Sequence, residues 1–166
     1  MGADARDEPA ARIFFALVPP PPLQAALGVL ATGVAQRAHG RAVPADNLHV
    51  TLAFIGAWPV ARLSHWLDVA ARCAGAAIDV TLDRLGGFRR AGVAWIGSSA
   101  PPPALLELSG ALGVALAAAN VAVDGRAFTA HLTLARRCRG PFPDEPAGPF
   151  HWRVDAISLM RSFTEP

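Results

Sequence analysis

The chain has 166 residues, of which 52% are hydrophobic and 17% charged, and its formal net charge is +2. A chain this apolar is expected to pack into one ordinary globular domain, which excludes disorder over most of its length. The small net charge does not by itself indicate a protein that coats nucleic acid. All 15 basic residues are arginine and tyrosine is absent, which indicates biased base composition first and function second.

Cysteine usage and hydropathy both favour a cytoplasmic protein. Cys73 and Cys138 have neither a C-x-x-C partner nor the spacing of a metal site, which is typical of reduced thiols. The apolar run 13–18 is too short for a signal segment, and no window approaches the roughly 18 apolar residues that a spanning helix needs. Arg6 stands where a myristoylation signal needs Ser or Thr. We therefore expect a cytoplasmic protein that binds no membrane.

Hydrophobic periodicity predicts alternating strands and helices in the first half of the chain. Residues 1–11 are polar and are expected to form a disordered tail, followed by a strand over 12–18. The prolines that follow favour a helix starting near Pro22, which Gly40 ends. A polar connector leads into a strand over 48–55 that Gly56 and Pro59 are expected to break. A second helix is predicted over 60–75 and a strand over 78–82. The helix is expected to bury Leu63, Leu67, Val69 and Ala70.

The second half continues the pattern and defines the fold class. A turn is predicted at Gly86-Gly87, a short strand over 92–97, and a helix over 104–120. Residues 121–129 lead into a strand that ends near Arg137, the proline-rich stretch 140–149 is predicted to be a loop, and 152–162 a last strand. This order indicates an α+β fold. Because no linker is long enough to separate two domains, we expect residues 1–166 to form a single bilobed domain.

One five-residue motif occurs once in each half of the chain. His49-Val50-Thr51-Leu52-Ala53 returns as His131-Leu132-Thr133-Leu134-Ala135, and both copies lie in predicted strands. Side chains at i and i+2 of a strand share one face, so each copy presents an imidazole and a hydroxyl together while its apolar residues face a core. A lone His-x-Thr is more often structural, but two copies matching at four of five positions favour a symmetric site.

Two facing imidazoles and two hydroxyls suit the cleavage of a phosphodiester. With pKa values near 6.5, one histidine can be neutral and the other protonated, so one activates water while the other protonates a leaving oxygen. Thr51 and Thr133 can donate hydrogen bonds to a phosphate, and Arg136 can add a charge-assisted one. Arg136 lies at an odd offset from His131 and needs a twist or a bulge to share its face.

Other chemistries fit the sequence less well. A zinc site through the histidines lacks Asp, Glu or Cys at ligand spacing, and we expect no metal and no cofactor. The chain has no P-loop, no dinucleotide fingerprint and no serine-hydrolase elbow. His39, His65 and His151 do not repeat and are interpreted as surface residues, and the four tryptophans as packing residues. Phe14 and Phe54 are candidates for stacking on a nucleobase, with a core role at least as well supported.

These residues also resemble a known family, the two-histidine phosphoesterases, and within it the RNA 2′,3′-cyclic phosphodiesterases once named 2′-5′ RNA ligases. The resemblance covers nearly the whole chain. It is carried by residues 12–17, 43–56, 93–97, 128–136 and 157–163, and most specifically by the stretch around His49.

The resemblance implies a fold and a reaction. The fold would have two antiparallel-sheet lobes related by a pseudo-twofold axis, with helices on the outer faces and a central cleft between the motifs. The reaction would open a terminal 2′,3′-cyclic phosphate to a 2′-phosphate without a metal, with RNA ends or cyclic nucleotides as partners and the protein a monomer. His49 would be the acid and His131 the base, although the near-symmetry of the motif leaves the opposite assignment open. Thr51, Thr133 and Arg136 would hold the phosphate.

The chain departs from the family pattern in two places. Ala130 stands where relatives often have proline before the second histidine, and relatives usually continue past Ser162-Phe163 into another strand. Two alternatives also stay open: an RNA-binding module with little catalysis, and the same chemistry on another substrate. Such substrates include 2′-5′ linked oligonucleotides, with reverse ligation, and an ADP-ribose cyclic phosphate.

Overall fold

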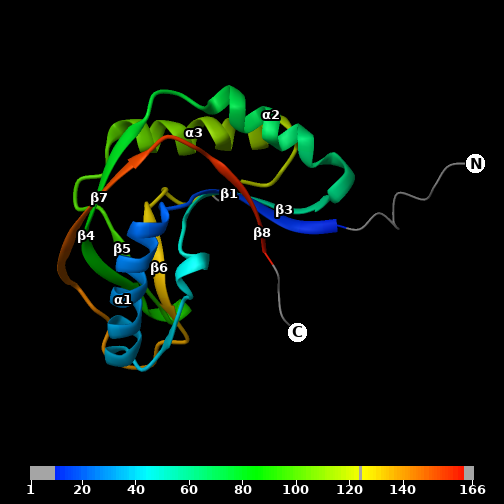
Figure 1. Cartoon of the computed structure of the whole chain (residues 1–166). Helices are drawn as coiled ribbons and strands as arrows, with labels where there is room; N and C mark the ends of the chain where they lie inside the picture. Colours follow the sequence, from blue (N-terminus) through cyan, green and yellow to red (C-terminus); the bar gives the residue numbers. More distant parts are fainter. Residues whose placement is uncertain (1–9, 124, 163–166) are drawn as a thin grey trace, which may run out of the picture.

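The structure, a computed structural model, describes residues 10–123 and 125–162. In these ranges the chain forms three α-helices, three short 3₁₀ turns and eight strands (Figure 1). The helices are α1 (Pro21–Arg37), α2 (Leu63–Cys73) and α3 (Pro103–Ala118), and the 3₁₀ turns are η1 (Ala45–Asn47), η2 (Val60–Arg62) and η3 (Arg89–Ala91). The strands are β1 (Ala10–Leu17), β2 (Arg41–Ala42), β3 (Val50–Pro59), β4 (Ile78–Phe88), β5 (Val93–Gly97), β6 (His131–Arg136), β7 (Glu145–Val154) and β8 (Ser158–Ser162).

All strand pairs are antiparallel, and the strand order is β7-β4-β5-β6-β3-β1-β8, with β2 pairing separately to β6. The sheet is narrowest in its middle, because β6 and β3 share one paired position, Val50 with Leu132. This point divides the sheet into two lobes, β7-β4-β5-β6 and β3-β1-β8, with one histidine motif at each inner edge. The predicted α+β class with antiparallel sheets is confirmed.

The helices cover the two lobes separately. Helix α1 packs on β6, whereas α2 and α3 lie together over the lobe that contains β3 and β8 (Figure 1). The buried side chains of both lobes, including Phe15, Trp66, Leu116 and Leu132, form one continuous hydrophobic cluster. None of the helices in the described ranges is long and apolar enough to cross a membrane.

Several predicted boundaries were wrong for reasons of packing. Strand β3 continues through Gly56 and ends only at Pro59, because Gly56 adopts a positive φ of 90° at an irregularity in its pairing with β1. In α2 the predicted core residue Leu67 is 54% exposed and Trp66 is fully buried instead. Of the predicted tail, residues 1–9 lie outside the described ranges, but Ala11 is buried in β1 opposite Trp58.

The predicted turn at Gly86-Gly87 was also wrong, because β4 runs through both glycines to Phe88. A side chain at Gly86 would meet the ring of Trp95 on β5, and one at Gly87 would meet Phe142. These glycines therefore provide room for aromatic rings, and the turn follows at η3 and Gly92, which has a positive φ of 61°.

The predicted proline loop and final strand were only partly right. Strand β7 begins at Glu145, inside the predicted loop, and tolerates Pro146 and Pro149 because it is an edge strand. The stretch 152–162 is not one strand: it contains the end of β7 and the whole of β8, which occupy opposite edges of the sheet. The departure from the family pattern at the C-terminus concerns residues 163–166, which lie outside the described ranges.

Candidate active site

The two histidine motifs lie side by side where the lobes meet. Val50 pairs with Leu132 across β3 and β6, and both side chains are buried in the core. In an antiparallel pair, opposite residues point to the same face and the face alternates along each strand. The register therefore directs His49, Thr51, His131 and Thr133 to the other face, with Thr51 across from His131 and His49 across from Thr133. All four are half-buried.

Both histidine rings are held in the same way by the backbone. The Nδ1 of His49 lies 2.7 Å from the carbonyl oxygen of Asn47, and the Nδ1 of His131 lies 2.7 Å from the carbonyl oxygen of Thr129. A carbonyl can only accept, so each neutral ring carries its proton on Nδ1 and leaves Nε2 unprotonated. In each motif the backbone contact thus engages Nδ1 and leaves Nε2 as the other ring nitrogen. Residue type at position i−2 does not predict this contact, because the acceptor belongs to the main chain.

Each histidine ring also lies against aromatic rings of its own lobe. The ring centroids of Phe14 and His49 are 5.0 Å apart, and Phe54 lies 5.8 Å from Phe14. On the other side, Phe88 approaches the His131 ring edge-on at 4.9 Å and Trp95 lies 6.1 Å away. Phe54 is 66% exposed whereas Phe14 is buried, so Phe54 presents a ring to solvent and Phe14 supports His49 from below.

The sequence did not single out Phe88 or Trp95 as site residues. Trp95 was interpreted as a packing residue, yet it lies on the strand beside β6 as Phe14 lies on the strand beside β3. Extending the repeat to the neighbouring strands would have found it. Phe88 was missed because the predicted turn at Gly86-Gly87 placed it outside a strand.

Arg136 shares the face of the histidines through a local irregularity. The pairing of β5 with β6 shifts between Ala94 and Trp95, which makes Leu134 an extra residue and reverses the alternation beyond Thr133. This is the bulge that its offset from His131 requires. Consistent with this position, the charge of Arg136 acts on both imidazoles. Burial and then the Arg136 charge lower the pKa of His131; burial, Arg136 and His131 lower that of His49, and each backbone hydrogen bond opposes the shift.

The remaining polar groups of the site are available to a ligand. Within the described ranges, the hydroxyls of Thr51 and Thr133 make no hydrogen bond and Arg136 forms no ion pair. No group of three or more His, Cys, Asp or Glu side chains in these ranges could hold a metal ion. The side chains of this region thus include two imidazoles, two hydroxyls and one guanidinium.

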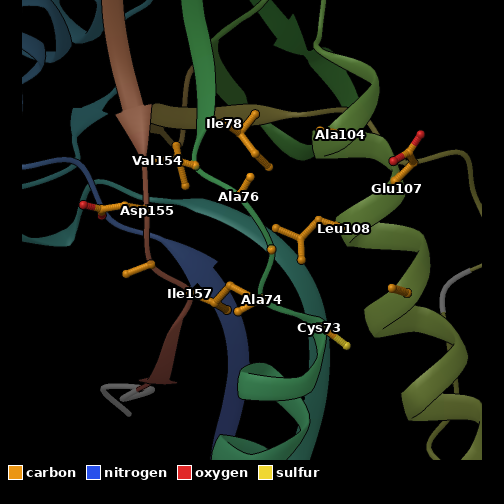
Figure 2. Close-up of a pocket in the computed structure, with 14 residues that line it drawn as sticks. Cys73, Ala74, Ala76, Ile78, Ala104, Glu107, Leu108, Val154, Asp155 and Ile157 are labelled. Carbon is orange, nitrogen blue, oxygen red and sulfur yellow. The ribbon is translucent and has the colours of Figure 1, made fainter.

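A hollow of about 340 Å³ lies elsewhere, between the segment after α2, helix α3 and the β7–β8 connection (Figure 2). Its walls are mostly alanine and aliphatic side chains such as Ile78 and Leu108, and the carboxylate of Asp155 points away from it. It contains no cationic group and none of the predicted site residues. The hollow is therefore separate from the two histidine motifs.

The protein has an α+β fold in which an antiparallel sheet brings two His-x-Thr motifs together at its centre. This arrangement is that of a phosphoesterase of the two-histidine class. Comparison with known proteins specifies the family. The family model described as LigT-like phosphoesterase matches residues 17–95. The chain is 32% identical over 167 residues to an RNA 2′,3′-cyclic phosphodiesterase of Thermus thermophilus, covering 93% of this chain and 83% of that protein. The chain belongs to the LigT-like phosphoesterase family.

Two further similarities agree with this assignment. An Escherichia coli protein named RNA 2′,3′-cyclic phosphodiesterase is 34% identical over 113 residues, a match that spans 68% of this chain and 64% of that protein. The crystal structure of E. coli LigT complexed with 3′-AMP superposes with a TM-score of 0.85 at 29% identity, covering 95% of this chain and 91% of that one.

Proposed function

We propose that this protein is a metal-independent RNA 2′,3′-cyclic phosphodiesterase that opens a terminal 2′,3′-cyclic phosphate to a 2′-phosphate. The observation that carries the proposal is the paired arrangement of His49 and His131. Each ring has its Nδ1 hydrogen-bonded to a backbone carbonyl 2.7 Å away. His49 immediately precedes β3, and His131 begins the adjacent strand β6. Two oriented proton carriers around one phosphate are what the opening of a cyclic phosphodiester needs.

The reaction starts with one of the two histidines protonated and the other neutral. The unprotonated Nε2 of one histidine takes a proton from water as the water oxygen bonds to phosphorus. The bond from phosphorus to the 3′ oxygen breaks, and the protonated Nε2 of the other histidine donates its proton to that oxygen. The product is a 2′-phosphate and a free 3′ hydroxyl, and the pair again carries one proton. Following the family resemblance, we assign His49 as the acid and His131 as the base.

The other groups would bind the phosphate. The hydroxyls of Thr51 and Thr133 flank the histidines on the same face and can donate to the non-bridging oxygens, where charge grows in the transition state. The exposed guanidinium of Arg136 adds a charge-assisted hydrogen bond. The exposed ring of Phe54, supported by Phe14, is our candidate for stacking on the terminal base.

The names of the relatives support an RNA substrate. Both curated relatives are named RNA 2′,3′-cyclic phosphodiesterases, and E. coli LigT has been crystallised with 3′-AMP. We extend this substrate class to the present chain, acting as a monomer. A reducing cytoplasm is the compartment that we propose, and Cys73 and Cys138 are both free thiols.

A turnover assay with excess chelator tests the proposal. The purified protein is incubated with a short RNA ending in a 2′,3′-cyclic phosphate, and the products are resolved by end group. We expect a 2′-phosphate product at the same rate with and without chelator. Tight RNA binding without product would instead support a binding module, and joining or cleavage of 2′-5′ linked oligonucleotides at a higher rate would change the substrate.

A further inference from the structure

Six arginines lie at one end of strand β6, some at strand ends and the others on the turns beside them. The backbone N–H of Cys138 donates to Gly92 at 2.9 Å, and the N–H groups of Arg139 and Gly140 donate to Ala38 at 3.0 and 2.9 Å. The segment after β6 is thus held between the β4–β5 turn and the α1–β2 turn, at the lower end of the molecule in Figure 1. We call six arginines of this region the arginine patch: Arg41 on β2, Arg89 and Arg90 in η3, Arg136 at the end of β6, and Arg137 and Arg139 just after it.

The charge of the arginine patch is not neutralised within the described ranges. All six side chains are exposed and none forms an ion pair there, whereas Arg37 and Arg84 bind the two acids that follow the patch, Glu145 and Asp144. Arg41 and Arg136 even face each other as paired residues of β2 and β6, an arrangement of like charges that is unfavourable without an anion. With a net charge of only +2 in the whole chain, this is a local concentration of charge.

The arginine patch begins at the histidine site and leads away from it. Arg136 belongs to both, since its charge lowers the pKa of His49 and His131. Phe88, whose ring contacts that of His131, immediately precedes Arg89 and Arg90 in η3. The guanidinium of Arg89 lies 5.6 Å from the centre of the Phe142 ring, which fixes its place on the turn. A chain of phosphates that ends at the histidines can therefore continue over the arginines.

We propose that the arginine patch binds the phosphodiester backbone of RNA on the 5′ side of the cyclic end. This inference rests on the proposed function and names the substrate class: an RNA strand of several nucleotides, in preference to a cyclic mononucleotide. A terminal cyclic phosphate leaves only the 5′ side of the strand to extend away from the site. Planar guanidinium groups match the geometry of phosphate oxygens. Contacts to the phosphate backbone carry no base information, so we expect this contact to be independent of the RNA sequence.

The test compares two double variants with equal loss of charge. Arg90→Gln/Arg139→Gln removes two charges from the patch, and Arg62→Gln/Arg72→Gln removes two exposed arginines of η2 and α2 that also lack an ion pair in the described ranges. Binding of a 12-nucleotide RNA with a 2′-phosphate end is measured by fluorescence anisotropy between about 0.05 and 0.5 M salt, a range over which counterion release is readily measured. This readout requires no turnover.

We expect RNA binding by the patch variant to depend less steeply on salt concentration than binding by the wild-type protein. Single-stranded nucleic acid contributes a slope of about −0.7 per phosphate contact to log K against log salt, so losing two contacts reduces the slope by about 1.4 and weakens binding roughly 25-fold at 0.1 M salt. The ratio of kcat/KM for cyclic-ended RNA to that for a cyclic mononucleotide should fall by a similar factor. The control variant should keep both values.

An unchanged slope in the patch variant, or an equal loss in the control variant, would overturn the proposal. So would an equal fall of kcat/KM for the mononucleotide, because the arginines would then serve the cleavage site. If the RNA binds through the patch but the wild-type protein does not open the cyclic end, the proposed function fails while the patch assignment stands.

Discussion

Replacing either histidine by asparagine separates its chemical role from its structural one. The side-chain amide of asparagine carries an N–H near the position of Nδ1, so it can keep the bond to the carbonyl of Asn47 or Thr129 that is now 2.7 Å long. It has no atom at the position of Nε2 and cannot transfer a proton. The asparagine variants should therefore fold as the wild type does. Alanine variants lose the hydrogen bond as well, at about 0.5–1.5 kcal/mol.

The expected loss of activity is large. A positioned acid or base contributes about 10²–10⁴ in rate, or about 2.7–5.4 kcal/mol of transition-state stabilisation. His49→Asn and His131→Asn should each lower kcat/KM on cyclic-ended RNA by this factor. The double variant should be little worse than the poorer single variant, because the two groups act in the same step. Initial rates and urea unfolding of all three proteins provide the measurement.

One substrate distinguishes the acid from the base. If sulfur replaces the 3′ oxygen of the cyclic phosphate, the leaving thiolate needs little protonation, so the variant without the acid should recover activity and the variant without the base should not. We expect recovery for His49→Asn. Recovery for His131→Asn would reverse the assignment, and a folded single variant that retains more than about a tenth of the wild-type kcat/KM would refute the paired mechanism.

Three further predictions follow from the same geometry. Because the pKa values of His49 and His131 are both lowered, the singly protonated pair should be most abundant below pH 6.5, where kcat/KM should peak; Arg136→Gln should move the peak to higher pH in a pH–rate profile, and an unmoved peak would contradict the coupling. Leu132→Ala should cost about 2–5 kcal/mol in urea unfolding, since the side chain is fully buried where β3 meets β6, whereas Leu132→Met should cost under about 1.5. Phe54→Ala should weaken nucleotide binding by about 1–3 kcal/mol without loss of stability; ribose 2′,3′-cyclic phosphate, which lacks a base, should bind both proteins equally.

The local pattern of the sequence predicted which residues share a face of a strand better than it predicted where the elements end. The repeated His-x-Thr unit needed only the alternation of a strand to place imidazole and hydroxyl on one face, and the structure joins the two units at Val50 and Leu132. The pairing of two strands far apart in the chain did not follow from the periodicity of either. The repeat itself suggested that the two strands are neighbours, because two copies of one motif can contribute to one symmetric site.

Glycines and prolines do not follow their local preferences where tertiary contacts decide their role. Gly86 and Gly87 are turn residues by local preference, but rings from distant segments occupy the space that their side chains would fill. Pro146 and Pro149 are strand breakers by local preference, but β7 is an edge strand that pairs on one side only. In both cases the deciding contact is made by residues that no local window contains.

The same dependence on distant contacts explains why only some of the aromatic residues around the histidines were predicted. Phe14 was named from its strand, whereas Phe88 and Trp95 reach His131 from β4 and β5, two strands whose pairing depends on Gly86 lying under the Trp95 ring. Both imidazoles are thereby partly removed from water, and burial is the main reason why their pKa values fall. The single negative charge of a bound cyclic phosphodiester would oppose this shift and favour one imidazolium. In the proposed mechanism, the charge of the substrate would thus help the histidine pair to keep the proton that it transfers.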